Sequence, residues 1–211
     1  MALAVTPFGI AFGVAGAKAG LALWQTSGFS VLVFSGSAQL AAVDIVGRGG
    51  AVPSAIAAGL LLNLRSLGFG VAMAPSLSGP WWKRAAWSQL MIDEATAVGS
   101  AQSEQRWRRY GFVFAGVVLF LAWNLSTLLG ATAFAGAGDL VHRWGIDAAI
   151  PAAFLALLWP RLASLDQRVT AVVGGAVALA LVPIAPPGVP VIAAGLGVAA
   201  GWRARRNPSA A

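Results

Sequence analysis

Apolar residues run along the chain in long segments that short polar or proline-rich stretches separate. The longest segment, from Tyr110 to Gly138, contains no formal charge. An α-helix of about 20 apolar residues crosses a hydrocarbon core of about 30 Å, so the pattern predicts a membrane span at 110–136. Three more apolar segments precede it, at 5–23, 28–47 and 52–76.

The C-terminal half continues the pattern with shorter segments. One lies at 146–164, and an uncharged stretch from Val169 to Trp202 is interrupted by four prolines and a glycine between 183 and 190. Because proline ends a helix, this stretch is expected to form two short spans, at 169–184 and 188–202, or a re-entrant hairpin. Residues 80–109 are polar enough to form an amphipathic cytoplasmic or interfacial segment. The prediction is an all-α polytopic membrane protein with about seven spans, some short or broken, in one domain over residues 1–211.

Composition supports this class of protein. Of the 211 residues, 58% are hydrophobic and 10% are charged, whereas a soluble domain has roughly 25% charged residues. Such a chain could not cover a water-facing surface, which argues against a cytosolic enzyme. The absence of cysteine excludes disulfides, thiolate metal sites and cysteine nucleophiles.

The charge pattern predicts an orientation. The net charge of +7 would suggest nucleic acid binding in a soluble protein. Here eleven basic residues fall in loops on one side of the predicted spans and two on the other, with Arg65 inside a span. By the positive-inside rule the N-terminus is outside and the C-terminus is in the cytoplasm, so the expected location is the inner (cytoplasmic) membrane. The basic loops are therefore not expected to bind nucleic acid.

Polar residues interrupt the second apolar segment near its middle. Ser35, Gly36, Ser37 and Gln39 place hydroxyl, amide and backbone groups where only lipid or protein surrounds them. One interpretation is an unwound stretch that binds a solute through backbone and hydroxyl dipoles, as broken transporter helices do. The other is close helix packing through small residues with serine hydrogen bonds.

Asn63 and Arg65 lie halfway along the third segment. An arginine at this depth costs at least about 2.5 kcal/mol on insertion scales, so its guanidinium needs a carboxylate or water. Asp44, Asp93 and the carboxylate of a substrate are the candidates. Alternatively, the side chain reaches a span end.

Asp93 and Glu94 are the only adjacent acidic pair. A carboxylate in a low-dielectric site has a raised pKa and exchanges protons near neutral pH, which makes these residues candidates for proton coupling. The alternative is a pair of carboxylates at a helix N-terminus or in a loop, balanced by Lys83 and Arg84.

The remaining inventory does not favour an enzyme. The chain has one histidine and no phosphate-binding G-x-x-x-x-G-K-[ST] loop, and no metal or cofactor is expected. Glycines four residues apart (Gly9/Gly13, Gly16/Gly20 and Gly197/Gly201) predict close approach between helices.

Four blocks together resemble the AzlC family, the large subunits of branched-chain amino acid exporters named for azaleucine resistance. They are Pro7-Phe-Gly-Ile-Ala-Phe-Gly13, Val33-Phe-Ser-Gly-Ser-Ala-Gln39, Asn63-Leu-Arg65 with Gly70 and Ala74-Pro75, and Asp93-Glu94. The family often continues Asn-Leu-Arg with a histidine and has a tyrosine before the next glycine. This chain has Ser66 and Phe69 at those places.

The resemblance implies a secondary transporter subunit that exports branched-chain or other hydrophobic amino acids with a small membrane partner of the AzlD type. Arg65, with Asn63 beside it, would meet the substrate carboxylate, and the groups of Ser35–Gln39 would bind its charged ends. Asp93 or Glu94 would be the proton site. A membrane assembly or scaffold subunit, whose buried polar residues only fix helix packing, is the alternative.

Overall fold

The structure is a computed structural model, and it describes residues 2–134, 136, 155, 158–159 and 162–206. Within these residues every regular element is helical, which confirms the all-α prediction. The N-terminal part contains α1 (Ala2–Lys18), α2 (Leu23–Leu32), α3 (Gly36–Gly47), α4 (Val52–Asn63), α5 (Arg65–Met73) and the 3₁₀ turn η1 (Ala74–Ser76). It continues with α6 (Trp81–Gln89), α7 (Asp93–Ser100) and α8 (Gln105–Thr132), and the C-terminal part contains α11 (Leu165–Leu181), α12 (Val189–Ala194) and α13 (Gly197–Arg206).

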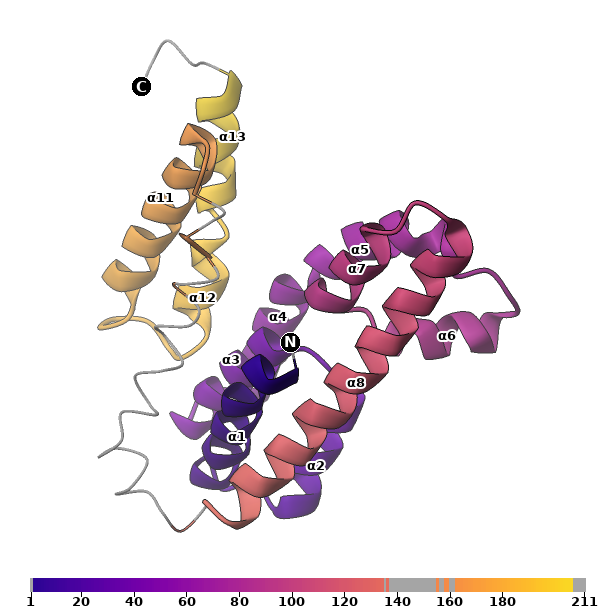
Figure 1. Cartoon of the computed structure of the whole chain (residues 1–211). Coiled ribbons are helices and arrows are strands. Elements are labelled where there is room, and N and C mark those ends of the chain that lie inside the picture. Colours follow the sequence, from indigo (N-terminus) through magenta and orange to yellow (C-terminus); the bar gives the residue numbers. More distant parts are fainter. Residues whose placement is uncertain (1, 135, 137–154, 156–157, 160–161, 207–211) are drawn as a thin grey trace.

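Helix α8 organises the N-terminal part of the fold (Figure 1). It packs along α1 and also contacts α2 and α7. A Cβ atom built at Gly9 would lie 2.7 Å from Ser126 Cβ, and one at Gly13 would lie 2.6 Å from the backbone nitrogen of Ala131. Only glycine permits this approach of the two backbones, so the Gly9/Gly13 prediction is confirmed.

The other two glycine pairs have different outcomes. Gly197 and Gly201 lie against the backbone of α11, where a Cβ atom at either position would come within 2.6 Å of a backbone atom. Gly20 instead has a φ of +80° and no neighbour within 4 Å. Gly16 does pack closely, since a Cβ atom there would lie 2.7 Å from the Thr26 side chain in α2. The Gly16/Gly20 prediction is wrong only for Gly20, which lies in the turn after α1.

Two helices are interrupted. The second apolar segment is not one helix, since residues 33–35 separate α2 from α3. The third bends by 41° between α4 and α5, at Leu64. The first predicted connection is also displaced: residues 24–27 are helical, and the turn lies at 19–22. Residues 19–22 contain no proline that would mark the end of α1 in the sequence.

The C-terminal helices form a hairpin in which α11 packs against α13 and α12, shown in orange and yellow in Figure 1. Its turn touches the N-terminal part near Gly188, where a Cβ atom would lie 3.0 Å from Ser54 Cβ. The predicted span 188–202 is divided into α12 and α13. The predicted span 146–164 lies almost wholly outside the described residues, and so does the single histidine of the chain, His142.

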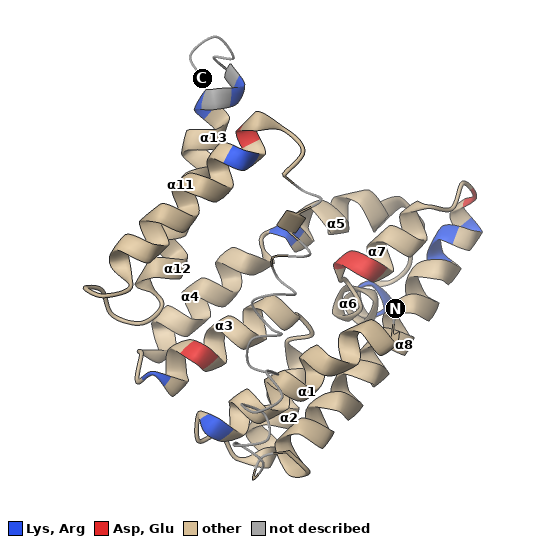
Figure 2. Ribbon diagram, turned by 60° about the vertical axis from the view of Figure 1, so that its left-hand side comes forward, with Lys and Arg blue, Asp and Glu red and all other residues tan. Residues whose placement is uncertain are grey.

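Length and hydropathy single out one helix of the described residues, α8, as able to cross a membrane. The bent pair α4–α5, extended through η1, qualifies if it counts as one span, and shorter apolar helices accompany it. Lysine, arginine and acidic residues gather toward helix ends and loops, while the middles of α8 and α11 are free of them (Figure 2).

Candidate functional site

The two helix interruptions lie side by side. Ser35, in an extended conformation just before α3, donates a hydrogen bond from its Oγ to Asn63 Oδ1 at 2.6 Å. Arg65 Nη2, at the start of α5, donates to Ser37 Oγ at 3.0 Å. Two segments 28 residues apart in sequence are thus joined by their polar side chains, and four of the predicted site residues meet here.

Asp93 completes the group as the first residue of α7. Arg65 Nη1 lies 3.0 Å from Asp93 Oδ2, and the two side chains are 44% and 26% exposed. The predicted internal carboxylate partner of Arg65 is therefore Asp93. Both side chains are therefore partly exposed at the surface of the chain. We call Ser35, Ser37, Asn63, Arg65 and Asp93 the break cluster.

Asp44, the other internal candidate, is engaged elsewhere. Its Oδ1 lies 2.9 Å from Arg48 Nε one turn along α3, and both side chains are more than half exposed. Asp44 is therefore not the partner of Arg65, because its carboxylate pairs with Arg48.

The position of α7 explains how Asp93 reaches the break cluster. Residues 90–100 run back along the first turns of α8: a Cβ atom at Gly116 would lie 2.8 Å from Leu90 Cβ, and one at Gly99 would lie 2.9 Å from Phe112 Cβ. Met73 and Ala95 are buried in the same cluster. Asp93 consequently lies beside the uncharged part of α8.

Two glutamines satisfy the end of α2. The last four carbonyls of a helix have no partner within it. Gln39 Nε2 donates to the carbonyls of Phe29 (3.1 Å) and Ser30 (3.3 Å), and Gln89 Nε2 donates to Val31 (2.6 Å) and Leu32 (3.4 Å).

Gln39 was predicted as a substrate-binding residue, but its side chain is fully buried and holds the α2 end. Its Oε1 is also buried and has no hydrogen-bond partner within the described part of the chain. Gln89 was missed by sequence reasoning, because it lies outside the apolar segments in a stretch of mixed polarity. A glutamine at the end of a short amphipathic helix carries no signal of its own.

Gly36 has a packing reason to be glycine. A Cβ atom there would lie 2.8 Å from the Trp123 ring. Trp123 itself is buried against Phe12, with their ring centroids 6.3 Å apart. Gly36 therefore lets the start of α3 approach α8.

Glu94, next to Asp93, is half-buried at the start of α7. Both carboxylates lie at a helix N-terminus, where the helix dipole favours negative charge, as one of the two interpretations expected. Asp93 pairs with Arg65, and neither acidic residue forms an ion pair with Lys83 or Arg84. The described residues contain no group of three or more His, Cys, Asp or Glu side chains that could hold a metal ion.

Comparison with known proteins supports the assignment that the motifs suggested. The model of the AzlC protein family matches residues 1–137, which include the whole break cluster. No curated protein and no solved structure matches the chain significantly. The chain therefore belongs to the AzlC family, which is linked to branched-chain amino acid export and generally comprises transporter components rather than enzymes.

Proposed function

We propose that this chain is a secondary transporter subunit of the cytoplasmic membrane that exports branched-chain or other hydrophobic amino acids through the break cluster, coupled to protons. The observation that carries the proposal is the Arg65–Asp93 pair at the meeting point of two interrupted helices. A guanidinium and a carboxylate side by side are complementary to a zwitterion. The amino acid carboxylate binds Arg65 bidentately, and its ammonium group binds Asp93.

Membrane placement is supported by the surface of α8. Phe114, Leu121, Leu125 and Leu128 are between 44% and 71% exposed, and their spacing puts them on one face of the helix. The opposite face is buried against α1, α2 and α7. An exposed apolar stripe of this length is stable in lipid and costly in water.

The pair also provides a coupling mechanism. Protonation of Asp93 removes the negative charge that would bind the ammonium group of the substrate. Proton and amino acid therefore exclude each other at this site, which is the requirement for exchanging one for the other. Ser35, Ser37 and Asn63 supply neutral hydrogen-bonding groups beside the charges, so the ends of the substrate stay solvated at membrane depth.

The scaffold alternative rests on the same pair. An ion pair that only fixes helix packing is expected to be sealed, whereas Arg65 is 44% exposed. The partial exposure of the Arg65 side chain supports the carrier over the scaffold. A small hydrophobic partner of the AzlD type would cover part of the apolar surface in either case.

The test is efflux of leucine from vesicles reconstituted with Arg65→Gln, Asp93→Asn or both. We expect each single variant to lose transport by roughly ten- to a hundredfold, since an interaction with a charged group contributes about 1.5–3 kcal/mol, and the double variant to lose more. The matched control is Asp44→Asn with Arg48→Gln, which removes an exposed Arg–Asp pair of similar length (2.9 Å against 3.0 Å). Efflux at the normal rate from the neutral double variant would reject the proposal and favour the scaffold.

A further inference from the structure

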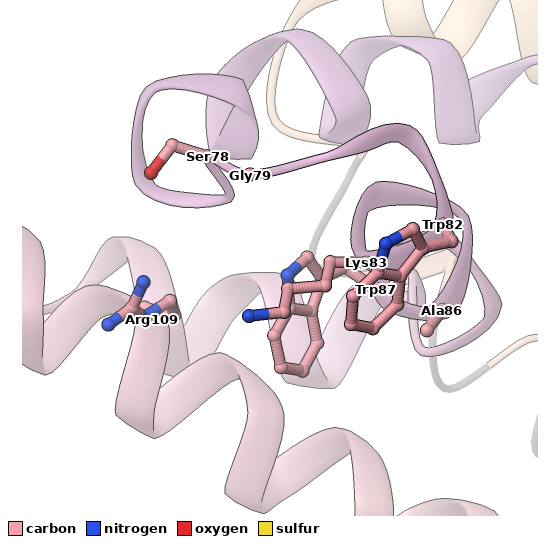
Figure 3. Close-up of a pocket in the computed structure, with 7 residues that line it drawn as sticks. All are labelled: Ser78, Gly79, Trp82, Lys83, Ala86, Trp87 and Arg109. Carbon is pink, nitrogen blue, oxygen red and sulfur yellow. The ribbon is translucent and has the colours of Figure 1, made fainter.

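A pocket of about 450 Å³ lies away from the break cluster, at the N-terminal end of α8. Its lining includes Ser78 and Gly79 from the loop after η1, Trp82, Lys83 and Trp87 from α6, and Arg109 from α8. Figure 3 shows Arg109 on one side and the α6 residues on the other, with the loop above them. Neither the transport proposal nor the family assignment uses this pocket.

The charge of the pocket is positive and uncompensated. Lys83 and Arg109 are the charged residues of the lining, which includes no carboxylate. In the described part of the chain neither forms an ion pair. Lys83 Nζ lies 5.2 Å from the centre of the Trp82 ring, and this cation–π contact orients the ammonium group. Two cations without a counter-ion in the lining favour an anion.

The wall of the pocket also offers neutral donors. Trp87 Nε1 is buried and has no acceptor among the described residues. An indole N–H can only donate a hydrogen bond, so it requires an oxygen atom. Ser78 contributes a hydroxyl group. Two cations and a hydroxyl group in one lining, with an unsatisfied indole donor buried behind it, match a phosphate group, whose oxygens are all acceptors.

The position of the pocket identifies the source of the phosphate. Arg109 is the last charged residue before the apolar length of α8 begins at Tyr110, and Tyr110 and Phe114 are 63% and 71% exposed just beyond it. A ligand with its phosphate at Arg109 lies at the level where the exposed apolar length of α8 begins, so its acyl chains can extend along that length. Tryptophan and basic side chains are typical of this headgroup level.

We propose that this pocket binds the phosphodiester headgroup of an anionic phospholipid of the cytoplasmic leaflet. The lipid would tie α6 to the base of α8. The inference uses the membrane placement proposed above but not the identity of the transported solute. Its readout is lipid binding, so its failure can be told apart from a failure of the efflux test.

The experiment is native mass spectrometry of the full-length protein in detergent, titrated with phosphatidylglycerol, phosphatidylcholine or inorganic phosphate. Lys83→Gln with Arg109→Gln is expected to weaken phosphatidylglycerol binding roughly thirtyfold, because each basic residue contributes about 1 kcal/mol. The matched control, Arg84→Gln with Arg106→Gln, removes the same charge from the same two helices outside the pocket lining and is expected to change binding less than twofold.

A second variant guards against misfolding of the first. Trp87→Phe keeps an aromatic ring and removes the Nε1 donor, and it should weaken binding about threefold. Equal losses in the pocket and control variants would overturn the proposal, because general charge attraction would then explain the binding. Equal binding of phosphatidylcholine would also overturn it, and so would inorganic phosphate binding as tightly as the lipid.

Discussion

The Arg65–Asp93 pair is open enough to exchange partners. An ion pair between partly exposed side chains contributes only about 0–1 kcal/mol, so a zwitterion that replaces both contacts loses little. Ser37 accepts a hydrogen bond from the guanidinium at 3.0 Å, so Arg65 has a second partner besides Asp93. Lysine would not serve equally well, since it lacks the fork that binds a carboxylate and a hydroxyl together.

Asp93 rather than Glu94 is expected to carry the proton, because only Asp93 contacts Arg65. Asp93→Asn keeps the size of the side chain and removes the titratable group. We expect leucine-driven proton movement to fall about tenfold or more in this variant, whereas Glu94→Gln should stay within about twofold of the unmodified protein. A pH-sensitive dye enclosed in proteoliposomes measures both. The reverse ranking would move the proton site to Glu94.

At the scale of elements, interrupted helices create the site. Residues 33–35 and Leu64 break two apolar segments where they meet, and the freed backbone groups need partners. Gln39 and Gln89 supply them for the end of α2. The break is thereby a stable part of the structure, and Ser35 and Asn63 hydrogen-bond to each other beside it.

Close packing of α1 on α8 holds this arrangement together. Gly13→Ala is expected to lower the free energy of unfolding by about 1–3 kcal/mol, because the added methyl group overlaps the α8 backbone. Gly28→Ala, in α2, is the control: a Cβ atom there meets nothing within 4 Å, and alanine favours a helix by up to about 1 kcal/mol. Thermal unfolding in detergent would measure both changes, and equal midpoints would contradict the packing account.

The whole molecule combines an N-terminal part built on α8 with a C-terminal hairpin that touches α4 near its turn. The break cluster and the family match both lie in the N-terminal part. The basic residues around α6 and the start of α8 mark one end of that part (Figure 2).

Taking this basic end as the cytoplasmic side corrects two expectations. Helix α1 runs parallel to α8, with Gly9 against Ser126 and Gly13 against Ala131, so the start of α1 faces the same side as the start of α8 and the expected outside N-terminus is contradicted. Lys18 lies beside Arg48 rather than on the opposite side, since a Cβ atom at Gly47 would lie 3.2 Å from Ala19 Cβ.

The orientation can be tested directly because the chain has no cysteine. Single Ser103→Cys and Arg48→Cys substitutions place one thiol at each exposed end of the N-terminal part. We expect a membrane-impermeant maleimide to label Arg48→Cys in intact cells and Ser103→Cys only after permeabilisation, by the positive-inside rule. The opposite labelling pattern would invert the proposed topology and place the phospholipid pocket in the outer leaflet.

Composition and the spacing of apolar residues alone determined the all-helical class and the apolar length of α8, because both depend on local sequence. They also marked the polar residues inside apolar segments as candidates for a site. Ser35, Ser37, Asn63, Arg65 and Asp93 were all candidates before their distances were known. Tertiary structure decided how they assemble. Arg65 forms its ion pair with Asp93 and not with Asp44. Gly36 packs on Trp123, and Gln89 donates a hydrogen bond to the end of α2. Partners 28 or more residues apart are selected by how helices cross, and no pattern within one segment contains that information.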